Sequence, residues 1–518
     1  MPLLKAMATV AGMTGLSRIA GFIRDILMAA ILGAGPVADA FFVALKLPNF
    51  FRRVTAEGAF SVSFIPVYSK TLKNEGEDEA GRFAGNVFGI MFLSLSVFTV
   101  LGLWAMPYVI YVIAPGFADD PERHRMAVEM TRITLPYLLL ISLSALIGGM
   151  LNAHNRFAAF AFAPVLFNLC LIVALLSGSD ILDTPGHALS WGIFTAGILQ
   201  LILLVSVLRV HGIPLTLSVP RFDEKFHRIL KLMGPGVIGA GVMQINLFAD
   251  MIIASLLGPG SISYLYYADR LNQLPLGVVG IAVGTALLPM LSQAIAEKDI
   301  NKARDLFNRS LEYCLIFALP AAVALAVIPF TLVEGLFERG AFTAEATHQT
   351  GFVLIGYALG LPAYIFVKVL STVYWAQEDT KTPVKIAIYT ALLNIVFSLI
   401  LVWPLGVAGI AFSTGLTGWL QFWLLNRNLR QKHLDTAIAE LDDRFRSALP
   451  KIVAGTLIMG SALYILNILL TQNLEGLFPG ASVAIMVLLV FSGMAIYALT
   501  LFKTGVLRTS DIKTYFKR

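Results

Sequence analysis

Long apolar stretches, separated by short polar connections, run along the whole chain of 518 residues. Most of them reach the roughly 20 residues that a helix needs to cross the hydrocarbon core of a membrane. A sliding window of hydropathy therefore predicts about fourteen membrane-spanning helices. The predicted spans are residues 5–33, 37–68, 82–113, 126–152, 158–178, 187–209, 228–257, 261–295, 303–329, 347–375, 383–403, 406–428, 447–471 and 481–502.

The composition supports the same class. The chain is 57% hydrophobic and only 14% charged, with a mean hydropathy of +0.79. A soluble protein has about a quarter charged residues. The two cysteines, Cys170 and Cys314, both lie in apolar stretches and are too few for a disulfide framework or a metal site. We therefore predict an all-α polytopic membrane protein.

Basic residues predict the orientation. If the N-terminus lies in the cytoplasm, most of the 38 Lys and Arg residues fall in cytoplasmic connections, and Arg123, Arg125 and Arg339 are the basic residues of the opposite loops. This asymmetry follows the positive-inside rule and places both termini in the cytoplasm. The basic residues do not gather with aromatic residues on a soluble face, so no nucleic-acid partner is expected despite the net charge of +6.

A weak internal repeat predicts the organisation of the helices. LGAGPVADAFFVALKLPN near the second span resembles LGPGSISYLYYADRLNQLP near the eighth, and the two copies lie six helices apart. An even separation predicts two parallel six-helix lobes, residues 1–222 and 223–432, followed by two extra helices and a tail in residues 433–518. Transporters built from repeats bind substrate near the repeat interface. The alternative is chance similarity between apolar helices.

Charged residues inside the predicted spans point to a polar site. Each costs about 2.5–3.5 kcal/mol near a helix centre, so these residues must face a protein interior or a wet cavity. The residues are Arg18, Arg24, Asp25, Asp39, Lys46, Arg52, Arg53, Glu57, Arg132, Asp250, Asp269, Arg270 and Lys368. Static salt bridges are the alternative, but basic residues outnumber acidic ones, so pairing cannot neutralise them all.

The spacing of these residues predicts a cavity wall. Along the second span, polar residues follow one another by 7, 3, 4 and 4 positions and share one helical face: Asp39, Lys46, Asn49, Arg53 and Glu57. In one continuous helix this stripe would be about 27 Å long. On the first span, Ser17 and Arg24 share a face that Arg18 flanks. Guanidinium groups bind phosphate in a bidentate manner, so the excess of arginine favours a diphosphate ligand.

Other residues leave two interpretations open. Lys368 either faces the cavity or extends to the membrane surface. Asp250 and Asn394 are candidates for a weak cation site, and the alternative is hydrogen bonding to neighbouring helices. The chain has no HExxH, GxxxxGK[ST] or GxSxG motif on a matching structural pattern. We therefore predict neither an enzyme nor a bound cofactor.

Four segments resemble the MurJ/MviN family of bacterial lipid II flippases, and the resemblance extends over nearly the whole chain. The segments are SRIAGFIRD (17–25), DAFFVALKLPNFFRRVTAEGAFSVSFIP (39–66), YYADRLNQLPLGVVGIAVGTALLP (266–289) and KTPVKIA (381–387). The resemblance implies two six-helix lobes around a central cavity. It also implies that the last two helices form a hydrophobic groove for a lipid tail.

The resemblance also implies roles for individual residues. Arg18, Arg24, Arg52 and Arg270 match the essential cations of the family's cavity. Asp39, Arg53 and Glu57 match positions that line the cavity or its gates. Asp250 and Asn394 match a cation site of part of the family, but Ser398 stands where that site has a second carboxylate.

The implied function is movement of lipid II from the cytoplasmic to the periplasmic leaflet of the bacterial inner membrane by alternating access. Lipid II and membrane lipids are the expected partners, cell-wall synthesis proteins are further candidates, and a monomer suffices because one chain holds both lobes. The alternative is an exporter of another polyprenyl-diphosphate-linked glycan, such as an O-antigen intermediate. A membrane glycosyltransferase fits less well, because it needs a catalytic carboxylate in a sizeable extracytoplasmic loop.

Overall fold

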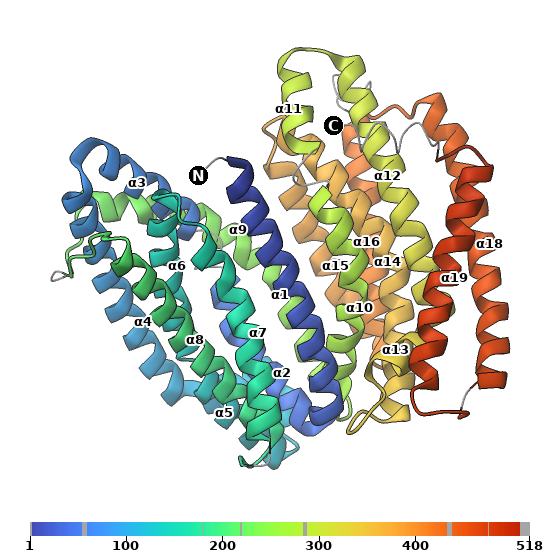
Figure 1. The fold of residues 1–518 in the computed structure, drawn as a ribbon, viewed down its shortest axis with the longest axis horizontal. Helices are drawn as coiled ribbons and strands as arrows, with labels where there is room; N and C mark the ends of the chain where they lie inside the picture. Colours follow the sequence, from blue (N-terminus) through green and yellow to red (C-terminus); the bar gives the residue numbers. More distant parts are fainter. Residues whose placement is uncertain are drawn as a thin grey trace. The chain divides into compact units, whose positions relative to one another are not determined.

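The computed structural model describes residues 3–53, 60–179, 181–217, 220–282, 287–431, 438–474 and 476–507. Within these ranges the regular structure is helical and no strand is found (Figure 1). Nine helical segments of the described chain are long and apolar enough to cross a membrane. The all-α membrane class is therefore confirmed, while the count of about fourteen spans stays a prediction.

The chain forms two compact units. The first comprises Met1–Ser263 with Gly340–Phe342, and the second comprises Tyr264–Arg339 and Thr343–Arg518. These units are defined by packing, whereas the lobes predicted above are defined by a repeat, and the lobe boundaries stay a prediction.

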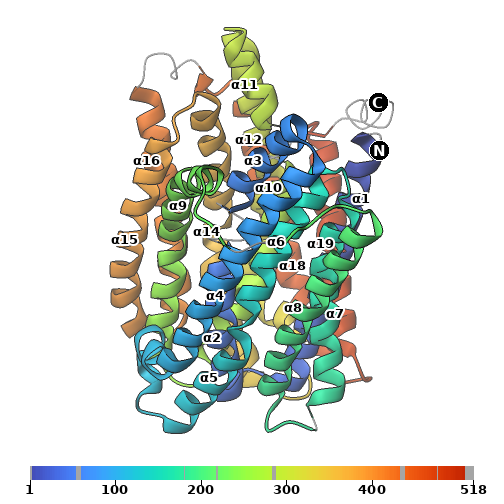
Figure 2. The ribbon, with the colours of Figure 1, turned by 90° about the vertical axis from the view of Figure 1, so that its left-hand side faces the viewer.

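In the first unit, α1 packs along α7, α7 along α8, and α2 along α5. Figure 2 shows α4 and α6, which also pack on each other, side by side. The elements of this unit are α1 (Leu3–Leu32), α2 (Pro36–Phe51), α3 (Phe60–Glu75), α4 (Glu77–Ile113), the short 3₁₀ helix η2 (Pro115–Phe117), α5 (Pro121–Thr134), α6 (Tyr137–Ala153), α7 (Ala158–Gly178), α8 (Pro185–Val210) and α9 (Glu224–Ser255).

In the second unit, α14 packs against α12 and α16, and the last pair, α18 and α19, packs against α12 and α13. The elements are α10 (Ser261–Ala282), which begins in the first unit, α11 (Leu288–Ala296), α12 (Ile300–Val327), α13 (Pro329–Phe337), α14 (Ala344–Ala376), α15 (Lys381–Leu405), α16 (Ala408–Gln431), α18 (Asp443–Leu474) and α19 (Ala481–Lys503).

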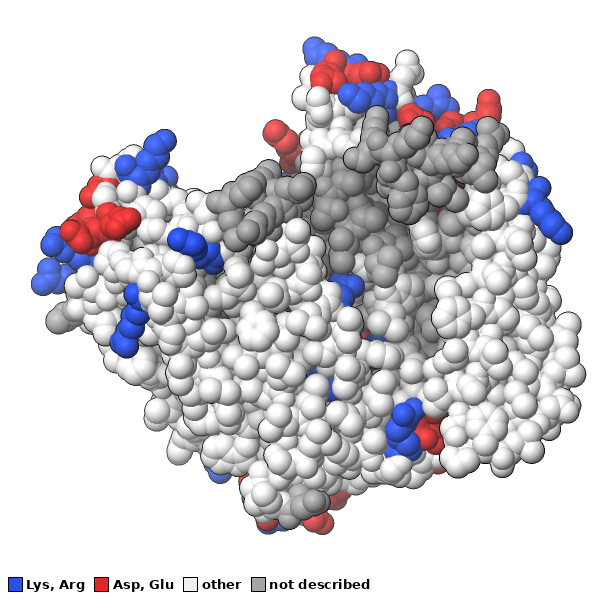
Figure 3. Space-filling model, in the orientation of Figure 1, with Lys and Arg blue, Asp and Glu red and all other residues white. Residues whose placement is uncertain are grey.

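The helix surfaces are those of a lipid-exposed protein. Trp104, Val112 and Trp403 are 75%, 70% and 87% exposed. Large apolar side chains in such numbers on the outside of a soluble protein would mark a binding surface. On the face that Figure 3 shows, charged side chains gather mostly towards the upper and lower margins of the view, with a broad uncharged surface between them.

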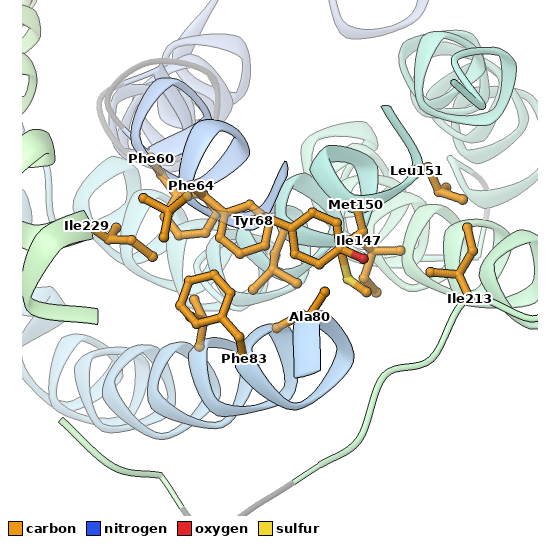
Figure 4. Packing of buried hydrophobic residues seen from close by; sticks show 14 of the residues in the cluster. Phe60, Phe64, Tyr68, Ala80, Phe83, Ile147, Met150, Leu151, Ile213 and Ile229 are labelled. Atoms are coloured by element: carbon orange, nitrogen blue, oxygen red, sulfur yellow. The ribbon is translucent and has the colours of Figure 1, made fainter. Parts of the chain in front are cut away.

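An aromatic core holds α3 against α4 and α6. The Phe64 ring stacks on those of Phe60, Tyr68 and Phe83, with centroids 5.3, 5.5 and 5.9 Å away. Figure 4 shows these rings beside Ile147 of α6. Burying side chains of this size contributes about 1.5–3 kcal/mol each, which fixes the position of α3 within the unit.

A polar segment lies along α4 and leads into α9. Asn86 accepts a hydrogen bond from the Arg221 N–H (2.7 Å) and donates to the Arg221 carbonyl (2.8 Å) and the Asp223 carboxylate (3.1 Å). Asp223 also caps α9 by accepting from the Phe226 N–H (2.7 Å). At Gly85 a Cβ would lie 1.8 Å from the Thr216 carbonyl oxygen, so only glycine allows this approach.

The opposite end of α9 is also held. The Gly116 N–H donates to the Ser255 hydroxyl (3.2 Å), and a Cβ at Gly116 would lie 1.9 Å from the Ser255 carbonyl oxygen. Both ends of α9 are thus bound within the first unit.

In the second unit, a cluster of charges joins α12 to the start of α18. Arg309 pairs with Asp442 and with Glu312, and Glu312 also pairs with Arg444 at 3.3 Å. Asp442 accepts from the Phe445 N–H (2.7 Å), so it caps α18 as well. Burial raises the pKa of Asp442, but the Phe445 N–H and the Arg309 guanidinium outweigh it and hold that pKa below its usual value.

The sequence pattern predicts one helix over residues 37–68. The structure describes α2 up to Phe51 and α3 from Phe60, and residues 54–59 lie outside the described residues, so the continuity of this span stays a prediction. Arg52 and Arg53 have π-helical geometry. Pro48 lies inside α2, where it removes a backbone donor and weakens the last turns. The described α-helical part of the polar stripe therefore stops before Arg53.

Candidate functional site

Asp39 occupies the first turn of α2, which follows α1 after a short turn. Gly35 caps the helix and Pro36 is its first residue, a position where proline costs nothing because its missing N–H has no partner there. A carboxylate in the first turn interacts favourably with the helix dipole. The local sequence thus fixes where this buried charge lies.

Four donors converge on the Asp39 carboxylate. Arg123 donates through Nη2 (2.7 Å), and the Gly260 N–H donates to the same oxygen (2.7 Å). Ser263 donates to the other oxygen from its N–H (2.9 Å) and its hydroxyl (2.7 Å). Asp39 is 0% exposed and Arg123 is 3% exposed. We call these four residues the Asp39 clasp.

Arg123 completes the clasp from α5 and corrects the sequence analysis, which placed it in a loop. Pro121 starts α5, and the Asp120 side chain caps it by accepting from the Arg123 N–H (3.1 Å). The guanidinium carbon of Arg123 also lies 4.0 Å from the centroid of the Phe117 ring. The apolar window begins after this turn, so hydropathy alone assigned Arg123 to the preceding connection.

Arg24 on α1 is hydrogen-bonded to Asp25 and Asn168. Its Nε (3.1 Å) and Nη2 (2.7 Å) donate to one oxygen of Asp25, and its Nη1 donates to the side-chain oxygen of Asn168 on α7 (2.8 Å). The Asn168 amide nitrogen donates to the Ser17 carbonyl (3.0 Å). Arg24, Asp25 and Asn168 are all buried. Sequence analysis missed Asn168, although it is the one amide in the apolar helix α7.

Arg18 differs from Arg24. It is exposed on α1, and among the described residues it makes no hydrogen bond or ion pair. It lines a cavity of about 470 Å³ in the first unit together with Thr14, Ser17, Asn152 and Phe157. The guanidinium is therefore presented to a space large enough for a ligand group.

The remaining candidates of the polar stripe have varied surroundings. Lys46 and Asn49 are half-buried on α2, and Arg52 donates from Nε to the Asn49 side chain (3.2 Å). Arg53 is exposed. Glu57 lies outside the described residues.

Asp269, Arg270 and Lys368 belong to the second unit. On α10, Asp269 accepts a hydrogen bond from Gln273, and the Arg270 guanidinium lies 4.6 Å from the centroid of the Tyr266 ring. Lys368 is exposed on α14. These residues stay predicted members of the site.

The candidate cation residues lie in different units, Asp250 in the first and Asn394 in the second. The Asn394 amide lies 3.2 Å from the hydroxyls of Thr414 and Thr417 on α16. Across the described ranges, no group of three or more His, Cys, Asp or Glu side chains could hold a metal ion.

The fold is that of a helical membrane transporter. A multidrug-resistance transporter of the MATE family, solved in an inward-facing conformation, aligns with a TM-score of 0.69 at 15% identity, covering 81% of this chain and 96% of that one. An outward-facing MATE transporter aligns with a TM-score of 0.56. At this identity the likeness concerns the fold alone.

The chain belongs to the lipid II flippase MurJ family, whose model matches residues 28–488. A probable lipid II flippase MurJ from Rhizobium meliloti is 41% identical over 100% of this chain and 97% of its own length. The lipid II flippase MurJ of Burkholderia cenocepacia is 35% identical, covering 83% of this chain and 84% of its own length. A lipid II flippase MurJ structure, inward closed, aligns with a TM-score of 0.79 at 27% identity, over 96% of this chain and 99% of that one.

Proposed function

We propose that this protein flips lipid II from the cytoplasmic to the periplasmic leaflet of the bacterial inner membrane by alternating access. Membership of the flippase family supports the substrate, and the apolar helices support a multi-pass location. Both termini lie in the cytoplasm in this proposal, because the basic residues gather in the connections on that side. The protein acts as a transporter without a catalytic step, and one chain suffices.

Arg18 carries the proposed mechanism. A charge in a membrane-spanning helix costs about 2.5–3.5 kcal/mol near the centre unless water or a partner compensates it. Arg18 is exposed and lines a cavity, so an anionic ligand can reach it. We assign Arg18, Arg24, Arg52 and Arg270 to binding of the diphosphate, which guanidinium groups hold in a bidentate manner.

Closure of the periplasmic side is assigned to the Asp39 clasp. Its four hydrogen bonds join α2, α5 and the start of α10, so they must break if those elements separate. A membrane potential that is negative inside would assist export, by about 2.3 kcal/mol per negative charge and 100 mV.

The test is complementation of cells depleted of their own lipid II flippase. We expect rescue by the wild-type chain and failure of Arg18→Ala, Arg24→Ala, Arg52→Ala and Arg270→Ala at equal membrane levels. Arg82→Ala is the matched control, because Arg82 is an exposed residue paired with Glu79 at 3.3 Å. Rescue by all four variants would overturn the site. Failure of a well-expressed wild-type chain would favour export of another polyprenyl-diphosphate-linked glycan.

A further inference from the structure

The side chain of Asn168 has one orientation that satisfies both of its neighbours. Its oxygen accepts from Arg24 Nη1 (2.8 Å), and its nitrogen donates to the Ser17 carbonyl (3.0 Å). Turning the amide over would bring two donors together at Arg24 and two acceptors together at Ser17. The network therefore fixes the amide, and the amide fixes one side of the guanidinium.

Asp25 and Asn168 have different effects on the charge of Arg24. Asp25 is a carboxylate on the same helix, so it neutralises the guanidinium from its Nε and Nη2 side. Asn168 is neutral and comes from another helix, so it orients the group without neutralising it. An arginine that must meet a ligand anion needs a fixed direction, and Asn168 supplies it at Nη1 without adding a second negative charge beside the guanidinium.

Burial makes this contact costly to lose. Asn168 is 6% exposed, and it lies in a helix of otherwise apolar and small residues. A buried amide without partners in such surroundings is strongly unfavourable. Because its described side-chain contacts all go to α1, the amide ties α7 to the part of α1 that carries Ser17 and Arg24.

We propose that Asn168 is a positioning residue that holds the Arg24 guanidinium in the direction from which it binds the diphosphate of the substrate. This inference rests on the proposed function for the role of Arg24, but its geometric part can be tested without any substrate.

The first experiment measures how fast phenylglyoxal modifies each arginine of the purified full-length protein in detergent, read by mass spectrometry. Arg24 should react slowly in the wild type and about tenfold faster in Asn168→Ala, since a hydrogen bond to a charged group is lost. Arg18, which is exposed, reports reagent access within the same peptide. Asn86→Ala is the matched control, because Asn86 is an equally buried amide, 6% exposed, that contacts Arg221 and Asp223 instead.

The second experiment measures lipid II binding to the same proteins in nanodiscs, as a double-mutant cycle with Arg24→Ala. Asn168→Ala should weaken binding about tenfold in the wild-type background and have no further effect in Arg24→Ala, because coupled residues are not additive. Additive losses, or an unchanged rate of Arg24 modification, would overturn the inference. A faster modification of Arg24 with no effect of Arg24→Ala on binding would instead refute the proposed role of Arg24 and leave the positioning contact intact.

Discussion

Two buried arginine–carboxylate pairs among the described residues of the first unit, Arg24–Asp25 and Arg123–Asp39, are built in opposite ways. Arg24 and Asp25 are adjacent on α1, so their pair survives any rigid movement of that helix. Asp39 and Arg123 are 84 positions apart, and the same carboxylate reaches Gly260 and Ser263, 221 and 224 positions away. In the proposed mechanism the first pair holds a diphosphate-binding arginine within one helix, whereas the second pair can form only while three distant segments are together.

The largest loss of stability should follow from Asp39→Asn, which leaves the positive charge of Arg123 buried without a carboxylate partner. Removing one partner of a buried ion pair costs about 3–5 kcal/mol, and we expect the free energy of unfolding to fall by that amount. Thermal denaturation of the purified protein checks this. Glu79→Gln breaks the exposed pair with Arg82 and should change stability by less than about 1 kcal/mol. Equal effects of the two variants would contradict the clasp.

A smaller loss of stability should follow from Ser263→Ala, which removes the hydroxyl donor but keeps the backbone N–H that also donates to Asp39. We expect about 1.5–3 kcal/mol of destabilisation, the range for a hydrogen bond to a charged group. Ser261→Ala is the control, because the Ser261 hydroxyl donates to the Gly258 carbonyl two residues away from this contact. If both serine variants unfold at the same temperature as the wild type, the Ser263 hydroxyl adds nothing to the clasp.

Arg24→Lys tests the other pair. A lysine keeps the charge but not the planar fork that reaches Asp25 and Asn168 together, so lipid II binding should weaken about tenfold. The free energy of unfolding should fall by about 1–3 kcal/mol, because the buried Asn168 oxygen loses its donor while Asp25 retains a cation beside it. Binding to protein in nanodiscs measures the effect, with Arg82→Lys as the control. Full affinity in Arg24→Lys would show that charge alone suffices.

The smallest effect concerns the half-exposed cluster of α12 and α18 and depends on pH. The pKa of Asp442 is held below its usual value, so the carboxylate stabilises the fold above about pH 4 and this contribution is lost as the pH falls through the depressed pKa. Wild-type protein should therefore denature at a higher temperature than Asp442→Asn at pH 6, and the difference should shrink towards pH 3. A difference that does not depend on pH would rule out the charge as its cause.

Hydropathy predicted many of the helices, because a membrane-spanning helix is defined by a local run of apolar residues. The first predicted span, 5–33, falls on α1 at Leu3–Leu32, and the last, 481–502, falls on α19 at Ala481–Lys503.

The candidate site was predicted less completely, for a physical reason. Asp39, Arg18 and Arg24 were predicted because a charge in an apolar stretch is costly to bury and needs water or a partner to compensate it. The same argument could not predict that Arg123 pairs with Asp39, because a contact between residues 84 positions apart produces no periodic pattern in the sequence. Asn168 was missed because uncharged polar residues were considered only where they accompanied a candidate charge, although a single amide in an apolar helix also requires a partner.

The two attachments of α9 restrict how that helix can change shape. Its N-terminal end is fixed to α4 through Asn86 and Asp223, and its C-terminal end is fixed at Gly116 through Ser255. A rod clamped at both ends cannot swing as a lever, so any change must be a bend between the clamps. The intervening sequence GPGVIGAG (234–241) contains the residue types that resist bending least. We therefore expect α9 to bend in its middle rather than to pivot about one end.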